Sequence, residues 1–173
     1  SYTFANPSQG LSVITGTGGD DITVASLDPA FSGSLIRYSG GVLRADLRSV
    51  ADTSTLSLVG PSLDDGLIVT LAVNSVSTSF GRPGQGVKTI VIDGKSGDDL
   101  FEVTEVLPID VNIVGGEGLH ALTGPSAGTQ WEITGANSGS AVGITSFIGT
   151  ETIRGSAGDD RFNFRSDSRG TGS

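Results

Sequence analysis

Cysteine and methionine are absent from this sequence of 173 residues, and histidine occurs once, at His120. Without cysteine, the chain has no disulfide framework, no Cys/His zinc site and no thiolate nucleophile. A Ser/His/Asp triad would have to use His120, because no other imidazole is present. These absences argue against most familiar enzyme chemistries.

Positive charge is also scarce, with 10 Lys and Arg against 19 Asp and Glu and a formal net charge of −9. Nucleic acids and anionic membranes both require a cationic surface, so neither is an expected partner. No run approaches the roughly 20 consecutive apolar residues of a membrane span, and residues 1–10 lack the pattern of a signal peptide. Because even position 1 is not methionine, we interpret the chain as a piece of a longer protein. Its lack of cysteine is compatible with an extracellular or cell-surface location.

Glycine is abundant instead, at 27 residues, among many Ser, Thr, Val and Ile residues. This composition favours short strands joined by tight turns. An Ile-x-Gly step recurs, and its last four glycines are spaced by 21, 20 and 20 residues. The copies are Ile14-Thr15-Gly16, Ile92-Asp93-Gly94, Ile113-Val114-Gly115, Ile133-Thr134-Gly135 and Ile153-Arg154-Gly155.

A unit of about 20 residues cannot bury its own apolar face, whereas a stack of such units buries a continuous column. The period therefore predicts an all-β fold, a parallel β-solenoid (β-helix or β-roll type) of about seven or eight coils. The five isoleucines would stack inward, and the glycines would turn the corners at positive φ. A β-sandwich with glycine-rich hairpins is the alternative. We expect one domain over residues 1–165 and a disordered tail or linker over 166–173.

Short strands are predicted beside the glycine turns, where four to seven residues are continuously apolar or alternate with polar ones. Residues 43–51 have leucines four apart but also alternate, and we interpret them as a strand. Residues 80–86 predict an inserted loop. The other strands are expected at 11–15, 22–25, 67–73, 89–92, 100–103, 110–114, 131–134 and 161–164.

Three turns continue as Gly-Asp-Asp followed by strand residues, at Asp20-Asp21, Asp98-Asp99 and Asp159-Asp160. The stretch Gly94-Lys95-Ser96-Gly97-Asp98-Asp99-Leu100-Phe101-Glu102 resembles the nonapeptide G-G-x-G-x-D-x-U-x of calcium-binding RTX β-rolls, without its second glycine. Residues 89–164, and again 11–25, are similar to the glycine- and aspartate-rich repeat regions of large secreted or surface bacterial proteins of the adhesin-like (haemagglutinin-like) class. The resemblance implies a repeat protein of the bacterial cell surface with Ca²⁺ held at its turns.

The metal ligands that this resemblance implies are Asp20, Asp21, Asp98, Asp99, Asp159 and Asp160, because calcium prefers carboxylate and carbonyl oxygens. Spacing weighs against a shared site. The fifth residue after each first glycine gives a row of Asp99, His120, Ser140 and Asp160, so no two Asp-Asp turns are expected to be neighbours. Alternatively, these aspartates accept hydrogen bonds from the amides of their own turn and keep the edge charged.

Three further features have mainly structural interpretations. His120 could act as a general base or bind a metal, but we favour packing beside Asp99. Trp131 is expected to pack at a coil edge, since a carbohydrate platform has several aromatics at coil spacing. A basic stripe in the C-terminal part either steers an acidic partner or, as we favour, offsets Asp159 and Asp160. It consists of Arg154, Arg161, Arg165 and Arg169.

The sequence thus predicts a non-enzymatic structural or adhesive module of an extracellular bacterial repeat protein, with calcium as a stabilising ion. One alternative is a polysaccharide-active β-helix enzyme, with paired carboxylates and a basic residue in a cleft. Another is a partner-binding domain that adds a strand at an exposed solenoid edge. The expected partners are an extracellular or cell-surface protein or glycan, or a second copy of the chain at the solenoid ends. No catalytic residue is assigned.

Overall fold

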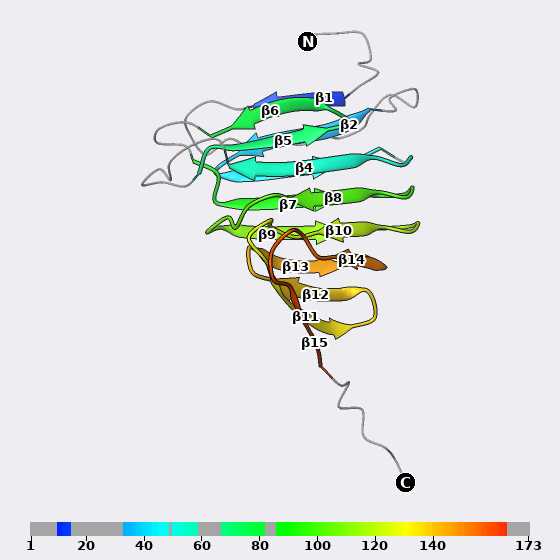
Figure 1. Cartoon of the computed structure of the whole chain (residues 1–173). Helices are drawn as coiled ribbons and strands as arrows, with labels where there is room; N and C mark the ends of the chain where they lie inside the picture. Colours follow the sequence, from blue (N-terminus) through cyan, green and yellow to red (C-terminus); the bar gives the residue numbers. More distant parts are fainter. Residues whose placement is uncertain (1–9, 15–32, 49, 59–66, 82–85, 166–173) are drawn as a thin grey trace, which may run out of the picture.

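The computed structural model describes residues 10–14, 33–48, 50–58, 67–81 and 86–165 (Figure 1). Several predictions from the sequence lie outside these residues. They are the turn at Asp20-Asp21, the strand at 22–25, most of the inserted loop and the tail at 166–173.

The described chain is all-β and forms two mixed sheets. The larger sheet has nine strands, in the spatial order β1 (Gly10–Ile14), β2 (Ser34–Ser39), β3 (Val42–Asp46), β7 (Thr89–Asp93), β9 (Asp110–Val114), β13 (Ile144–Ile148), β12 (Ser138–Ala141), β11 (Gln130–Gly135) and β15 (Arg161–Phe164). The smaller sheet has six, in the order β14 (Thr152–Arg154), β10 (Ala121–Thr123), β8 (Leu100–Val103), β4 (Thr53–Leu58), β5 (Val69–Val73) and β6 (Val76–Phe80). The described residues include no helix with the length and apolar character to cross a membrane.

In its central part the chain alternates between the sheets. Strands β7 and β9 belong to the larger sheet, and β8 and β10, which follow them, belong to the smaller one. Parallel pairing joins β3, β7, β9 and β13 in one sheet and β4, β8, β10 and β14 in the other. The strands therefore stack as rungs along the molecule, as Figure 1 shows. Two mixed sheets that enclose one core fit a sandwich-like layout, the alternative considered from the sequence.

The predicted column of five isoleucines is only partly formed. Ile92 and Ile113 are buried register partners in β7 and β9. By contrast, Ile133 lies in β11, Ile153 lies in the smaller sheet, and Ile14 is half exposed at the edge strand β1. The prediction that all five form one column was therefore wrong.

An inserted hairpin explains the break in this column. Strands β11 and β12 pair antiparallel around a turn in which Asn137 has a φ of 54°. Because the hairpin is added to the sheet, β13 rather than β11 takes the place beside β9. Phe147 consequently becomes the neighbour of Ile113.

The core lies between the sheets, where inward-facing residues alternate with outward-facing ones along the strands. In β7, for example, Ile90 and Ile92 are buried while their neighbours are partly exposed. Phe101 and Leu122 contribute from the smaller sheet. The predicted strand at 43–51 is shorter than expected, because β3 ends at Asp46.

Candidate functional site

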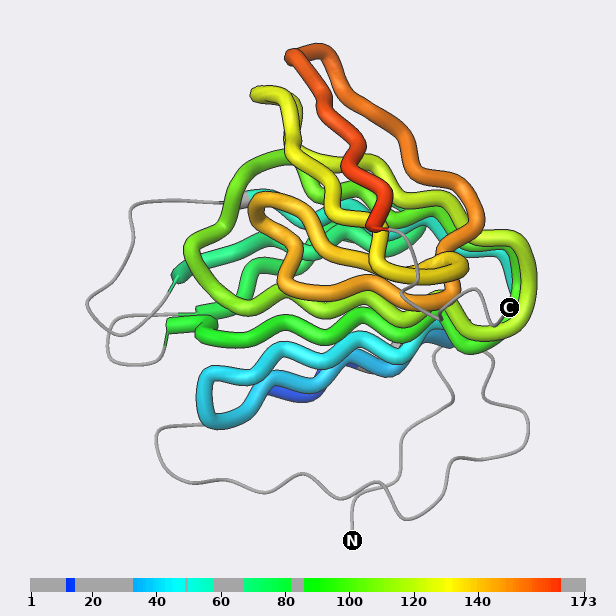
Figure 2. Tube along the Cα trace, turned by 90° about the horizontal axis from the view of Figure 1, so that it is seen from below, coloured from blue at the N-terminus to red at the C-terminus, as the bar shows by residue number. Residues whose placement is uncertain are grey.

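A turn of six residues recurs where the chain passes from the larger sheet to the smaller one, at 47–52, 94–99 and 115–120. These turns superimpose when the stack is viewed along its axis, at the right of Figure 2. Backbone bonds fix their alignment at both ends. The first residues of the turns donate from Leu47 N to Asp93 O, from Gly94 N to Val114 O and from Gly115 N to Ile148 O, each at 2.8 Å. The last residues accept, from Leu100 N to Asp52 O, from Ala121 N to Asp99 O and from Thr152 N to His120 O, at 2.8, 2.9 and 3.0 Å.

This alignment places Asp52, Asp99, His120 and Glu151 in one row, which we call the corner column. Each side chain after Asp52 accepts a hydrogen bond from the backbone amide of the preceding member. Asp52 N donates to Asp99 Oδ1 at 2.8 Å, Asp99 N to His120 Nδ1 at 3.2 Å and His120 N to Glu151 Oε2 at 2.7 Å. The corner column thus connects successive strands of the smaller sheet through side chains as well as through the backbone ladder.

The centre of the corner column is a buried Asp99–His120 pair, with only 2% and 1% of the two residues exposed. Asp99 Oδ2 lies 3.2 Å from His120 Nδ1. Burial raises the pKa of Asp99 to about 6, although the hydrogen bond from the Asp52 amide opposes the rise.

Steric crowding explains why glycine recurs at the first position of these turns. A Cβ on Gly94 would lie 2.5 Å from Asp99 Oδ2, and one on Gly115 would lie 2.7 Å from His120 Cδ2. The polar side chain five residues later folds back over the glycine in both cases. Positive φ values occur instead at later glycines of the turns, such as Gly97 and Gly118, at 113° and 134°. Close approach, rather than positive φ, therefore explains the first glycine of the repeat.

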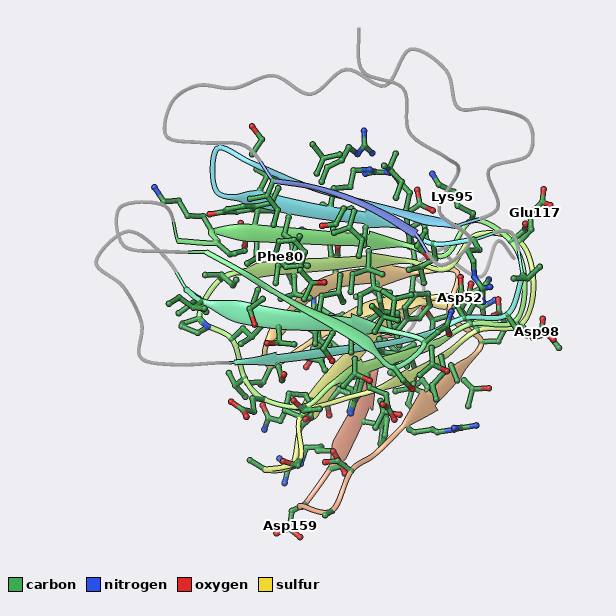
Figure 3. The ribbon with its side chains drawn as sticks, turned by 90° about the horizontal axis from the view of Figure 1, so that it is seen from above. Asp52, Phe80, Lys95, Asp98, Glu117 and Asp159 are labelled. Atoms are coloured by element: carbon green, nitrogen blue, oxygen red, sulfur yellow. The ribbon has the colours of Figure 1, made fainter. Side chains whose placement is uncertain are left out.

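The structure brings only some of the predicted ligands into contact with neighbouring layers. Exposed Asp98 accepts the amide of Leu119 at 2.9 Å. Asp160 accepts the amides of Thr129 and Ser156 at 3.0 and 2.8 Å, beside β11. Asp159 is exposed and lies far from Asp98 (Figure 3). These bonds agree with the alternative of amide acceptors, although most of the amides come from the adjacent layer rather than from the same turn.

The predicted row of Asp99, His120, Ser140 and Asp160 is correct for its first two members and wrong for the others. Glu151 follows His120, and Asp52 precedes Asp99. Sequence reasoning missed Asp52 because Leu47 replaces the first glycine of its turn. It missed Glu151 because the turn between β13 and β14 spans only residues 149–151. Glu151 therefore follows its glycine by two residues instead of five. The five-residue spacing from Leu47 to Asp52 was the available signal.

The described residues contain no cluster of candidate calcium ligands. Calcium requires about six to eight oxygen ligands. No group of three or more His, Cys, Asp or Glu side chains that could hold a metal occurs in the described part of the chain. Calcium binding therefore stays a prediction.

A second charged cluster covers the outer face of β3 and β7. Asp46 binds Arg44 at 2.8 Å and Lys95 at 3.2 Å, and Asp93 binds the same two cations at 2.9 and 2.7 Å. Burial opposes ionisation of Asp46, but hydrogen bonds from Arg44 and Lys95 hold its pKa below the usual value. Arg37 completes the cluster through Asp46. Three cations share two carboxylates here, and both carboxylates are paired, so we interpret the cluster as a structural network.

An apolar groove of about 430 Å³ opens at the end formed by β14 and β15. It is lined by Ile133, Gly135, Asn137, Ser138, Phe147, Thr150, Glu151, Ile153, Phe162 and Phe164. Trp131 is fully buried and packs against two aromatic residues that line the groove. Its ring is stacked on that of Phe162, with 5.9 Å between the ring centroids, and is edge-on to that of Phe147, with 6.0 Å between the centroids. Trp131 is thus a core residue rather than a residue at a coil edge.

Comparison with protein-family models, with curated proteins and with solved structures finds no match to this chain. Its function is therefore argued from its own geometry.

Proposed function

We propose that this chain is a non-enzymatic structural or adhesive module of an extracellular repeat protein, built as a parallel β-solenoid. The alternation of strands between two sheets supports the solenoid, since β3–β4, β7–β8, β9–β10 and β13–β14 stack as successive layers. Hairpins at β5–β6 and β11–β12 extend the sheets outside this pattern. The resemblance to bacterial surface repeats supports the extracellular setting.

The corner column is the observation that carries this proposal. Buried polar groups are costly unless they are hydrogen-bonded, and here they are used to connect one layer to the next. Glu151, the one charged residue of the apolar groove, is occupied in the same way. Its Oε2 accepts from His120 N and its Oε1 from Asn137 Nδ2, at 2.7 and 2.8 Å. Side chains that are held like this favour rigidity over catalysis.

Single-molecule force spectroscopy tests the proposal, with the full chain held at both ends. We expect a resolved unfolding event in the wild type and a lower unfolding force in Asp99→Ala, which loses the acceptor for the Asp52 amide. Glu105→Ala, an exposed carboxylate outside the corner column, is the matched control and should unfold like the wild type. If Asp99→Ala does not fold, Glu151→Ala replaces it as the test variant, and its unfolding force should also be lower because it loses the acceptor for the His120 amide. Extension of the wild type without a resolved unfolding event would contradict the proposal.

A screen over acidic polysaccharides tests the non-enzymatic part of the proposal. We expect no product from any of them. Release of unsaturated sugars by the wild type would contradict this and would restore the polysaccharide-active alternative.

A further inference from the structure

Among the described residues, the end of the molecule that carries the groove has two open strand edges. Strand β15 is the last strand of the larger sheet and β14 is the last strand of the smaller one. Arg161 and Arg165 donate their amides to Thr129 O and Ile133 O of the β11 side, both at 2.9 Å. Because amide directions alternate along a strand, those of Phe162 and Phe164 point to the open edge. Unpaired edges of this kind are templates for another strand.

Beside the open edge of β15 lies a row of apolar side chains. Phe162 and Phe164 are two residues apart and therefore lie on the same face of β15. They are 38% and 76% exposed, although both line the groove. Ile153 of β14 faces them from the other sheet. An added strand could place alternate apolar side chains in this groove.

The same two strands are positively charged in an acidic protein. They carry Arg154 and Arg161, and Arg165 follows directly. Arg165 pairs with Glu132 at 3.0 Å, whereas Arg154 and Arg161 form no ion pair within the described residues, including none with Asp159 or Asp160. Neither of these cations lines the groove, whose one charged lining residue, Glu151, is already bonded to His120 N and Asn137 Nδ2. They place positive charge on the two strands beside the groove. The eight residues after Arg165 contain no large apolar side chain that could fill it.

We propose that this end binds an extended acidic segment of another polypeptide, in which apolar side chains alternate with carboxylates, as an additional strand on β15. Main-chain bonds to Phe162 and Phe164 supply the pairing, and the groove accepts the alternate apolar side chains. Arg161 lies on the face of β15 opposite to Phe162 and Phe164, where the carboxylates of such a strand would also lie. It attracts these carboxylates and disfavours basic strands, which gives the site its selectivity. Binding here is independent of the structural role proposed above.

A labelled synthetic peptide with the sequence of residues 97–105, GDDLFEVTE, is a suitable probe because it is acidic and has Phe101 and Val103 two residues apart, on one face of an extended strand. Fluorescence anisotropy with the full chain should give saturable binding, which weakens as NaCl is raised because salt screens exposed charges. A second peptide with Asn and Gln in place of Asp and Glu should bind at least about tenfold more weakly.

Variants of the protein locate the site of binding. Phe164→Ser and Arg161→Glu should each weaken binding by roughly tenfold or more. Leu119→Ser is the matched control, since Leu119 is 69% exposed but lies on a corner turn outside the groove. Circular dichroism should show all three variants folded, because their side chains are exposed.

Three outcomes would overturn the proposal. They are an absence of saturable binding, equal affinity for the acidic and neutral peptides, and an equal effect of Leu119→Ser and Phe164→Ser. Light scattering after size-exclusion chromatography measures the oligomeric state, and thus tests whether a second copy of the chain occupies the groove. If the wild type dimerises with concentration and Phe164→Ser does not, a second copy of the chain fills the groove, and the proposed partner is wrong.

Discussion

At the scale of single residues, the corner column turns buried polar groups into connections between strands. Asp99 is central to it, because Oδ1 accepts the Asp52 amide while Oδ2 faces His120. Its ionised form is disfavoured by burial, so the pKa of this carboxyl is raised from 3.8 to about 6. Asp99 thus provides an essential acceptor but carries an unfavourable charge at neutral pH.

Asp99→Asn should stabilise the protein at neutral pH. Because the folded protein holds this proton up to about pH 6, the contribution of Asp99 to stability falls as pH rises from about 4 to about 6. Asparagine stays neutral and keeps the Oδ1 acceptor for the Asp52 amide. Urea denaturation should show a small difference from the wild type near pH 4 and a gain of about 1–3 kcal/mol at pH 7. Glu105→Gln, at an exposed carboxylate outside the corner column, should retain the wild-type pH dependence. A loss of stability in Asp99→Asn at pH 7 would refute this account.

Gly94→Ala should be strongly destabilising. The new Cβ would lie 2.4 Å from Gly115 O and 2.5 Å from Asp99 Oδ2, so the backbone of the next layer would have to move. Overpacking of this kind costs about 1–3 kcal/mol or more, measured by thermal or urea unfolding. Gly135→Ala is the control, because its Cβ would meet only the Ser138 hydroxyl, and it should change stability by no more than about 0.5 kcal/mol. Equal effects of the two substitutions would count against the steric explanation.

At the scale of elements, local pattern was a good guide to strands and a poor guide to their neighbours. The predicted strands at 100–103, 110–114 and 161–164 coincide with β8, β9 and β15. The 20-residue period of the glycine turns also predicted that Asp99 and His120 are neighbours. It failed at β11, because a hairpin has the same alternating pattern as a strand of the stack, and pairing direction depends on contacts distant in sequence.

The pair Ile113 and Ile148 tests which isoleucines belong to the core. Ile113 is buried against Ile92, whereas Ile148 is 58% exposed in the neighbouring strand β13. Ile113→Ala should therefore cost about 2–5 kcal/mol of unfolding free energy. Ile148→Ala should stay within about 0.5 kcal/mol of the wild type. A cost for Ile148→Ala as large as that for Ile113→Ala would contradict this assignment of the core.

At the scale of the whole molecule, the stack is held by one core and by side-chain bonds along its corner. The aspartate oxygens that an RTX-type calcium site would use accept backbone amides at Asp98, Asp99 and Asp160. Backbone amides of the described residues thus take the place that a metal would have at these three aspartates, although Asp99 Oδ2 accepts no hydrogen bond.

Removal of calcium should leave thermal stability unchanged. Melting curves of the purified protein in excess EGTA and in excess CaCl₂ are expected to superimpose, since Asp98, Asp99 and Asp160 accept backbone amides. Excess MgCl₂ is the control for ionic strength and divalent charge. A melting temperature that falls in EGTA and recovers with calcium alone would restore the calcium site that the sequence resemblance implies.

The sequence by itself determined the all-β class, the places of most strands and the recurring glycine turn, because these depend on composition and on local periodicity. Tertiary structure decided which strands are neighbours, that Asp52 and Glu151 join Asp99 and His120, and that the groove lies between β14 and β15. Those relations depend on sheet register, and the β11–β12 hairpin shifts that register without changing the local pattern of the chain.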